Sequence, residues 1–173
     1  MVLFLCSIMK EIKLSQRGKN KGKYVALVDD DDFDCLNQFK WSVYKSSNSF
    51  YTIRAIRIDG RRITQSMHCA IMNGKGIDHI DHNGLNNQKS NLRFCTQGQN
   101  MMNTRKRENC SSIYKGVSFY KSYGRWKANT AINGKDIFLG YFDTEIEAAM
   151  AYNKKAIEIY GEFANLNKFD SKK

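Results

Sequence analysis

Proline is absent from the 173-residue sequence, and cysteine and histidine are scarce. Without proline, the turns must be formed by glycine, asparagine and aspartate. The five cysteines are an odd number, lie far apart and form no C-x-x-C pair, which argues against a structural zinc site and against a disulfide framework. We therefore expect a protein of a reducing interior that uses no zinc.

Acidic residues are the minority among the charged ones: 17 Asp and Glu stand against 28 Lys and Arg, for a formal net charge of +11. Such an excess favours a polyanionic partner, most often nucleic acid, although a merely basic soluble protein is the alternative. Hydrophobic residues make up 42% of the chain, which is enough for packed cores in one domain or in two to three small ones.

The chain also has no long hydrophobic run, because the apolar stretch over residues 1–8 is too short to cross a bilayer. It lacks the positively charged segment with which a secretion signal begins. We interpret residues 1–9 as an extension upstream of the first domain. We expect a soluble, intracellular protein in a host or phage-infected cytoplasm, with no membrane partner.

Residues 10–50 predict a β-rich region that is followed by a long hairpin. The turn of that hairpin is Asp59–Gly60, between strands at 51–58 and 61–67. Further strands are predicted at 24–28 and 41–44, and a short helical turn at 68–72 that ends at Asn73–Gly74.

The four successive acids Asp29–Asp32 predict the N-cap and first turn of a short helix through Phe39, since acids there favour the helix dipole. A metal site is the other reading of this run, but the side chains of consecutive residues diverge.

The second half of the chain begins with a basic, almost apolar-free linker at residues 104–111. We read it as a solvated surface loop in which Arg105, Lys106 and Arg107 also contact DNA phosphates. Beyond it, strands are predicted at 114–119, 125–132 and 136–141, with Asn133–Gly134 as a hairpin turn. Thr144–Glu147 is a capping box that opens a helix to about Tyr160, closed by Gly161. The helical residues that we expect to face this sheet are Ile146, Ala149, Tyr152, Ala156 and Ile159.

The chemistry of the chain is concentrated in residues 77–100, where an acid, an imidazole and several amides lie between two short apolar runs. His79 is suited to general base catalysis because its ordinary pKa lies near neutrality. Asp78 and Asn100 offer oxygen atoms of the kind that bind Mg²⁺, and a substrate phosphate would have to complete such a site. Asn91 could hold the backbone or the imidazole of His79. The residues alone leave a second reading open, in which the Asp–His pair is structural and the Asn-rich loop is only a turn.

These residues resemble the ββα-metal motif of the HNH homing endonucleases. The likeness rests on Asp78–His79, the Asn-Gly-Leu-Asn-Asn loop, Ser90–Arg93 and Asn100, with Met67–His68 similar to the segment that leads into the motif. The resemblance implies that Asp78 and Asn100 bind one divalent metal ion. It also implies that His79 deprotonates the attacking water, and that Asn91 supports the turn and orients His79.

The chain departs from the family pattern at two positions. His82 stands where the family usually has glycine, and Cys69 stands where arginine commonly follows the first histidine. His68 and His82 are therefore candidates for structural or DNA contacts rather than for the chemistry.

The C-terminal half resembles the plant ethylene-response-factor (apetala-like) DNA-binding domain over residues 112–167. The likeness rests on Tyr114–Val117, Gly124–Ala128, Leu139–Thr144, Glu147–Tyr152 and the closing Gly161–Asn167. It implies a three-stranded sheet that lies in the major groove, with the helix on its other face. Ser118 stands where the plant domains usually have arginine, so a different base specificity is expected.

Strand alternation divides this sheet in the way that the resemblance requires. Trp126, Ala128 and Thr130 share the face that packs on the helix, with Trp126 as a core residue. The outward residues that we expect to contact DNA are Lys115, Tyr123, Arg125, Lys127, Asn129 and Phe138.

The sequence thus predicts an α+β fold: residues 10–50 as a β-rich region, 51–103 as the HNH nuclease core, 104–111 as a linker and 112–167 as a sheet packed on one helix. The predicted function is a site-specific homing DNA endonuclease from a mobile element such as those of phages. It hydrolyses phosphodiester bonds of double-stranded DNA with one Mg²⁺ or Mn²⁺ ion, as a monomer or weak dimer. The alternatives are a DNA-binding regulator with a decayed nuclease site and, more weakly, an RNA-directed nuclease.

Overall fold

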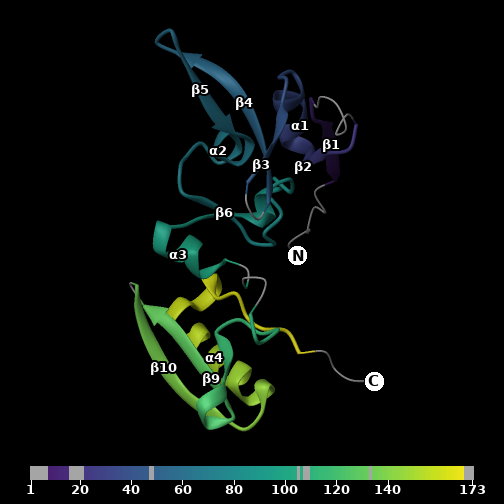
Figure 1. Ribbon diagram of the computed structural model, residues 1–173. Coiled ribbons are helices and arrows are strands. Elements are labelled where there is room, and N and C mark those ends of the chain that lie inside the picture. The colour runs from purple at the N-terminus through teal and green to yellow at the C-terminus, as the bar shows by residue number, and fades with distance from the viewer. Residues whose placement is uncertain are drawn as a thin grey trace, which may run out of the picture. The chain divides into compact units, whose positions relative to one another are not determined.

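The computed structural model describes residues 8–15, 22–46, 49–104, 106, 110–132 and 134–169. It divides into two compact units, Met1–Cys95 and Thr96–Lys173. Helices and small antiparallel sheets occur in both (Figure 1), which confirms the α+β class. Along the described part of the chain, no helix is both long and apolar enough to cross a membrane.

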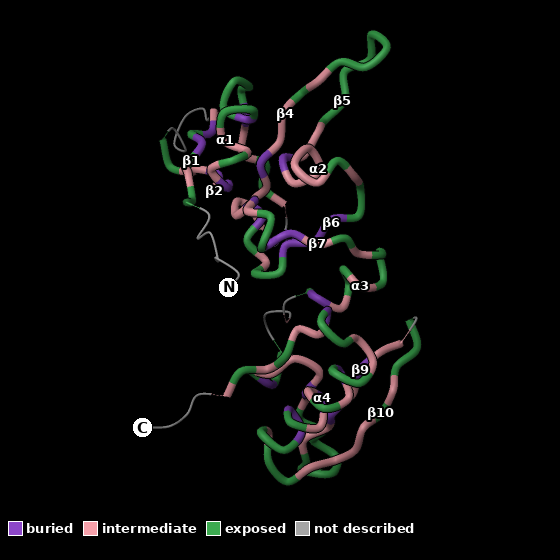
Figure 2. Tube along the Cα trace, turned by 180° about the vertical axis from the view of Figure 1, so that it is seen from behind, coloured by how far each residue is buried: buried purple, intermediate pink, exposed green. Residues whose placement is uncertain are grey.

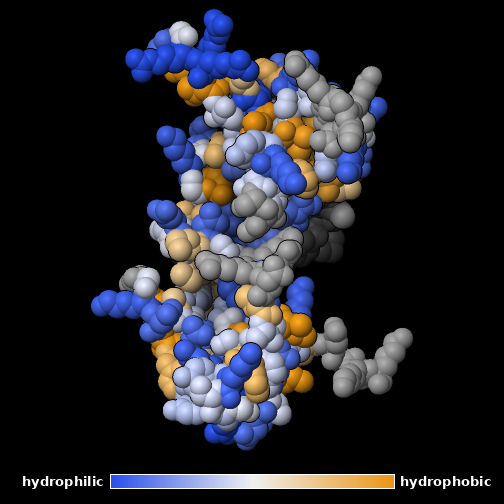
Figure 3. Space-filling model, viewed as in Figure 1, coloured by the Kyte–Doolittle hydropathy of each residue, from blue (hydrophilic) through white to orange (hydrophobic). Residues whose placement is uncertain are grey.

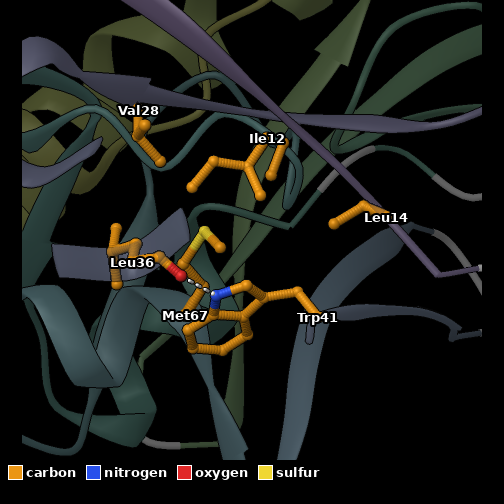
Figure 4. Packing of buried hydrophobic residues seen from close by; sticks show 7 residues of the cluster. Ile12, Leu14, Val28, Leu36, Trp41 and Met67 are labelled. Atoms are coloured by element: carbon orange, nitrogen blue, oxygen red, sulfur yellow. Dashed lines mark hydrogen bonds between the residues drawn. The ribbon is translucent and has the colours of Figure 1, made fainter. Parts of the chain in front are cut away.

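The core of the first unit lies between a two-stranded sheet and a short helix. β1 (Met9–Lys13) pairs antiparallel with β2 (Val25–Asp29), and α1 (Asp30–Asn37) follows at once, with three acids in its first turn as predicted. The buried cluster consists of Ile12, Leu14, Ala26, Val28, Leu36, Trp41 and Met67. Within it, the indole of Trp41 donates a hydrogen bond to the carbonyl of Leu36 over 2.8 Å (Figure 4), so the one polar atom of this large ring is satisfied.

A three-stranded sheet follows, formed by β3 (Ser42–Lys45), β4 (Phe50–Ile58) and β5 (Arg61–Ser66). The turn between the last two is Asp59–Gly60, and both residues have positive φ, which confirms the predicted hairpin turn. The end of this hairpin extends away from the core and is exposed (Figure 2). α2 (Met67–Ile71) then leads, through Asn73 at positive φ, to β6 (Ile77–His79).

The first unit closes with a short hairpin in which β6 pairs antiparallel with β7 (Leu92–Phe94). Between them run an Asn-rich loop and the 3-10 turn η2 (Lys89–Asn91).

The second unit begins with α3 (Gln97–Met102), which has a complete capping box at Thr96. Its sheet has the order β10 (Lys135–Phe142), β9 (Arg125–Ile132), β8 (Val117–Tyr120), with the 3-10 turn η3 (Lys121–Tyr123) after β8. One helix, α4 (Glu145–Tyr160), packs on this sheet and is followed by η4 (Gly161–Phe163). The capping box at Thr144 is present as predicted, whereas Asn133 of the predicted hairpin turn lies outside the described residues.

The packed face of α4 differs from the predicted one at its start. Ile146 is 48% exposed, so its assignment to the sheet-facing side was wrong. The buried stripe instead begins at Ala148 and Ala149 and continues through Tyr152 and Ala156. These residues recur at steps of three and four, and Ile146 lies on the opposite side of the helix from Ala148. Small residues fit here because the helix lies close to the sheet.

Two contacts fix the sheet and the chain ends of this unit. Gly116, at φ +74, lies so near Tyr152 that an added Cβ would overlap the ring and come within 2.7 Å of the Asn129 carbonyl oxygen. Asn167 binds the backbone of Lys115 on both sides, accepting from its N–H over 2.6 Å and donating to its carbonyl over 3.0 Å. The end of residues 112–167, the predicted DNA-binding region, is therefore tied to its beginning.

Candidate active site and nucleic-acid surface

The candidate active site is built on the β6–β7 hairpin of the first unit. Its register pairs Asp78 with Arg93 and His79 with Leu92. Asp78 and His79 are both buried, with 7% and 5% of their surfaces exposed. Buried ionisable groups on a surface hairpin need compensating partners, and the loop between the two strands supplies several of them.

The Asn-rich loop is anchored to the edge of β2. Leu27 accepts a hydrogen bond from the N–H of Asn87 over 2.7 Å and donates one to the carbonyl of Leu85 over 2.8 Å. The carboxylate of Asp29 accepts from the side chain of Gln88 and from the backbone N–H of Lys89. These hydrogen bonds hold the loop against β2 and so position its side chains.

Asn91 fastens the turn of the hairpin. Its side-chain oxygen accepts from the N–H of Asp81 over 2.9 Å, and its amide donates to the Asp81 carboxylate and to the carbonyl of Asn86. Burial pushes the pKa of Asp81 upward, but hydrogen bonds from Asn86, Asn83 and Asn91 outweigh burial and leave that pKa below its ordinary value. Asp81 therefore stays ionised as the acceptor at the centre of the turn. A catalytic role for Asn91 stays a prediction.

The imidazole of His79 is oriented by Asn87, a fully buried residue that the sequence interpretation did not single out. Nε2 of His79 lies 3.4 Å from Oδ1 of Asn87, whose own amide nitrogen donates to the Leu85 carbonyl. With the amide in this orientation, the Asn87 oxygen is placed to accept a hydrogen bond from Nε2 of His79, which orients the ring. Only the folded loop reveals this pairing, because the sequence offers several equivalent asparagines.

The charge state of His79 favours a base. Burial lowers its pKa below the ordinary value, and this effect outweighs the opposing influence of Asn87, Asp81 and Asp78. The ring is therefore neutral near pH 7 and able to accept a proton.

His68 lies against His79 on the other side, from α2. The two rings meet edge to face with their centroids 4.8 Å apart, and the ring of Tyr51 lies 5.9 Å from His79. Burial and the neighbouring His79 lower the pKa of His68 to about 4, so this ring is neutral as well. Its Nδ1 is buried and has no hydrogen-bond partner among the described residues. The structure thus brings His68 to the predicted base.

Asp78 offers a buried carboxylate, and carboxylate oxygens are the ligands that Mg²⁺ prefers. Its Oδ2 accepts hydrogen bonds from Nε and Nη2 of Arg93, the latter over 2.9 Å in a largely buried ion pair. The donor chemistry fits a hard divalent cation, with Arg93 as the cation that already neutralises the group. Among the described residues, no three His, Cys, Asp or Glu side chains gather in one place to hold a metal ion.

Asn100, the second predicted metal ligand, is exposed on α3 and belongs to the second unit. Its assignment stays a prediction.

His82 occupies the turn with an unfavourable backbone. Its φ is +61, in the left-handed region that favours glycine. Its N–H donates to the carbonyl of His79 over 3.0 Å, which closes the turn. The family's usual glycine at this position thus has a conformational reason here.

The candidate DNA surface is the face of the β8–β9–β10 sheet that is turned away from α4. The register places Lys127 beside Ser118 and Tyr141, and Asn129 beside Phe138, while Ala128 is buried on the helix side. This confirms the predicted division of the two faces, and Trp126 packs in the core as expected. The outward face also carries four aromatic rings, of which Tyr123 and Phe138 are 63% and 55% exposed. They are Tyr120, Tyr123, Phe138 and Tyr141, each in ring contact with at least one of the others.

The cationic residues that were predicted to contact DNA differ in their burial and in their partners within the unit. Lys127 lies near the ring of Phe138, whereas Arg125 forms an ion pair with Asp143 that is exposed to solvent and therefore weak. Lys115 is engaged inside the unit. Its ammonium donates to the carbonyls of Met102 and Thr104, and burial lowers its pKa to about 8. Lys106 is half-buried, and Arg105 and Arg107 lie outside the described residues.

Comparison with known proteins finds two kinds of relative. The chain is similar to an uncharacterized HNH endonuclease, L560, of Acanthamoeba polyphaga mimivirus, with 35% identity over 158 residues that cover 88% of this chain and 79% of the relative. About a third of the chain is similar to plant proteins. APETALA2-like protein 2 of Oryza sativa is 46% identical over 57 residues, and the AP2-like ethylene-responsive transcription factor TOE2 of Arabidopsis thaliana is 44% identical over 57. The matched part spans only 13% and 12% of these plant proteins. No family model and no solved structure matches the chain.

Proposed function

The chain belongs to the family of HNH endonucleases, and on that premise we propose that it is a site-specific DNA endonuclease of the homing type, which hydrolyses phosphodiester bonds with His79 as its general base. The observation that carries the proposal is the state of His79. It is buried, its ring is held beside Asn87, and burial lowers its pKa, so the neutral imidazole can take the proton of an attacking water.

The residues around His79 have distinct parts in this proposal. Asn87 fixes the orientation of the ring, and Asn91 with Asp81 keeps the hairpin turn closed beneath it. The hairpin thus presents the base at a set angle, and correct orientation is a large part of what an enzyme contributes to the rate.

Asp78 would hold a divalent metal ion, Mg²⁺ or Mn²⁺, with Asn100 as the second ligand that the family resemblance implies. When bound, such an ion supplies positive charge that stabilises the developing charge on the phosphate oxygens. Arg93 holds the Asp78 carboxylate in place through hydrogen bonds from Nε and Nη2.

The second unit would place the enzyme on double-stranded DNA. Support comes from the aromatic and basic outward face of its sheet and from the likeness to plant AP2-like factors. With one such nuclease site per chain, a single molecule would cut one strand at a time, and a double-strand break would need a dimer or two successive events.

The test is nicking of supercoiled plasmid with Mg²⁺ or Mn²⁺, compared between the wild type and His79→Ala. We expect the substitution to lower the rate by about 10²- to 10⁴-fold, the usual contribution of a general base. Lys154→Gln is the control, since Lys154 is exposed on α4 and has no part in the site, and its rate should stay close to that of the wild type. Unchanged nicking by His79→Ala would refute the base assignment.

A second candidate is a DNA-binding regulator whose nuclease site has decayed. The histidine at position 82 favours it, because it departs from the glycine that the family usually has in the turn beside His79. A wild-type protein that binds DNA but cuts it with none of several divalent metals would establish this alternative.

A further inference from the structure

A groove lined by two tyrosines lies beside the candidate active site, on one face of the β3–β4–β5 sheet. Its volume is about 620 Å³, and its lining is Tyr44, Tyr51, Ile53, Thr64, Ser66 and His68. This volume falls in the range of sites that hold small organic molecules or parts of larger ones. We call it the tyrosine groove.

Strand register explains why these residues share one surface. Tyr44 pairs with Tyr51 and Ile53 pairs with Ser66, so all four side chains project from the same face. His68 joins them from α2, directly after β5.

The Asn-rich loop of the active site also helps to shape the groove. A Cβ at Gly84 would come within 2.5 Å of the ring of Tyr51 and would overlap the carbonyl oxygen of Phe50. Only glycine lets the loop approach this closely. The loop that orients His79 therefore also sets the position of Tyr51.

The imidazole of His79 is not part of the groove's lining, but it contacts two rings that are, those of His68 and Tyr51. The ring of His79 lies 4.8 Å from that of His68 and 5.9 Å from that of Tyr51, measured between centroids. Tyr44, at the other side, is 54% exposed, and the buried Nδ1 of His68 has no hydrogen-bond partner among the described residues. A planar group in the groove would thus contact aromatic rings and the polar Nδ1 of His68, and His68 itself contacts His79.

The same face of the hairpin is positively charged farther out. Arg57 pairs with Arg62, two register steps beyond the Ile53–Ser66 pair, and both are exposed. The end of the hairpin is strongly hydrophilic in Figure 3, at the top of the view. The groove therefore lies between a pair of guanidinium groups and the base, along a path that suits a polyanionic strand.

We propose that the tyrosine groove receives an unpaired base of the DNA strand whose phosphodiester lies at His79. This rests on the proposed endonuclease function. The tyrosine rings offer stacking surfaces, and the hydroxyls of Thr64 and Ser66 offer hydrogen bonds to base edges. This combination is what proteins use for bases that have left the helical stack. The two arginines hold the adjoining phosphates.

The first experiment maps the contact directly. A short single-stranded oligodeoxynucleotide with one 5-iodouracil is bound to the full-length protein in EDTA, irradiated, and the linked residues are identified by mass spectrometry. We expect linkage to Tyr44 or Tyr51, retained in His79→Ala. The exposed rings Tyr123 and Phe138 serve as an internal comparison, and linkage to them without any in the groove overturns the proposal.

The second experiment uses paired variants in a binding assay with the same oligonucleotide. Tyr44→Leu should weaken binding about tenfold, whereas Tyr44→Phe, which keeps the ring, should bind like the wild type. Ile63→Ala is the control, because Ile63 is 41% exposed on the opposite face of the same sheet. Wild-type affinity in Tyr44→Leu overturns the proposal.

Neither experiment requires cleavage, so the two proposals fail separately. A protein that nicks DNA but shows no groove contact refutes the tyrosine groove alone. A protein that never nicks DNA but is linked through Tyr44 or Tyr51 refutes the nuclease proposal and supports base binding in the groove.

Discussion

Single side chains in the Asn-rich loop hold roles that their neighbours in the sequence do not share. Of the loop asparagines, Asn87 contacts the imidazole of His79 and Asn91 contacts the backbone of Asp81. The amides of Asn86 and Asn91 both donate to the Asp81 carboxylate. Asparagines with the same side chain thus have two roles, because Asn87 orients the base whereas Asn86 and Asn91 support the turn. The fold decides which residue has which role.

His82 permits a test at this scale, since its side chain and its backbone strain can be separated. His82→Ala removes the imidazole but keeps a Cβ at φ +61, whereas His82→Gly removes both. We expect the glycine variant to be more stable than the alanine variant by about 1 kcal/mol, because the left-handed conformation penalises a Cβ. Urea denaturation of the two variants measures the difference. Equal stability of the two would show that the turn relaxes without strain.

Among the elements, those specified by local chemistry were predictable and those specified by packing were not. Asp59–Gly60 and the Thr144 capping box act within a few residues, and both occur as expected. Ile146 was misplaced because several stripes on an Ala-rich helix look equally apolar. Only the close approach of the sheet selects the one with the smallest residues. Asn87 was missed for a similar reason, as its partners lie on β2 and β6.

The approach of α4 to the sheet depends on Gly116, and a pair of glycines can measure this dependence. Gly116→Ala meets the ring of Tyr152 and also strains a backbone at φ +74, so it should destabilise the second unit by about 3 kcal/mol. Gly124→Ala is the matched control. It has φ +60 with open space around it, and should cost only about 1 kcal/mol. Hydrogen exchange of the β9 amides reports the stability of this unit alone. Equal losses for the two variants would show that the helix–sheet contact adapts at no cost.

At the scale of the whole molecule, an excess of positive charge is combined with two candidate DNA surfaces. These are the tyrosine groove of the first unit and the outward face of the β8–β9–β10 sheet in the second. The net charge of +11 attracts any nucleic acid, but it does not say where the polymer lies. Such attraction alone would be spread over all exposed lysines and arginines. A defined binding surface behaves differently. Substitution of a lysine on that surface removes one phosphate contact, whereas the same substitution elsewhere removes none.

Lys127 and Lys154 separate these two cases in the full-length chain. Lys127 lies on the outward face of the sheet beside Phe138, whereas Lys154 is exposed on α4, the helix that covers the other face. If the sheet binds DNA, Lys127→Gln should reduce the slope of log affinity against log salt concentration by about one, the value for one lost phosphate contact. Lys154→Gln should leave the slope unchanged, and Phe138→Ala should weaken binding without altering the slope, since it removes contact area and no charge. Titrations of duplex DNA at several salt concentrations measure all three. Equal slopes for the two lysine variants would mean that the charge acts diffusely, and the sheet would lose its assignment as the DNA surface.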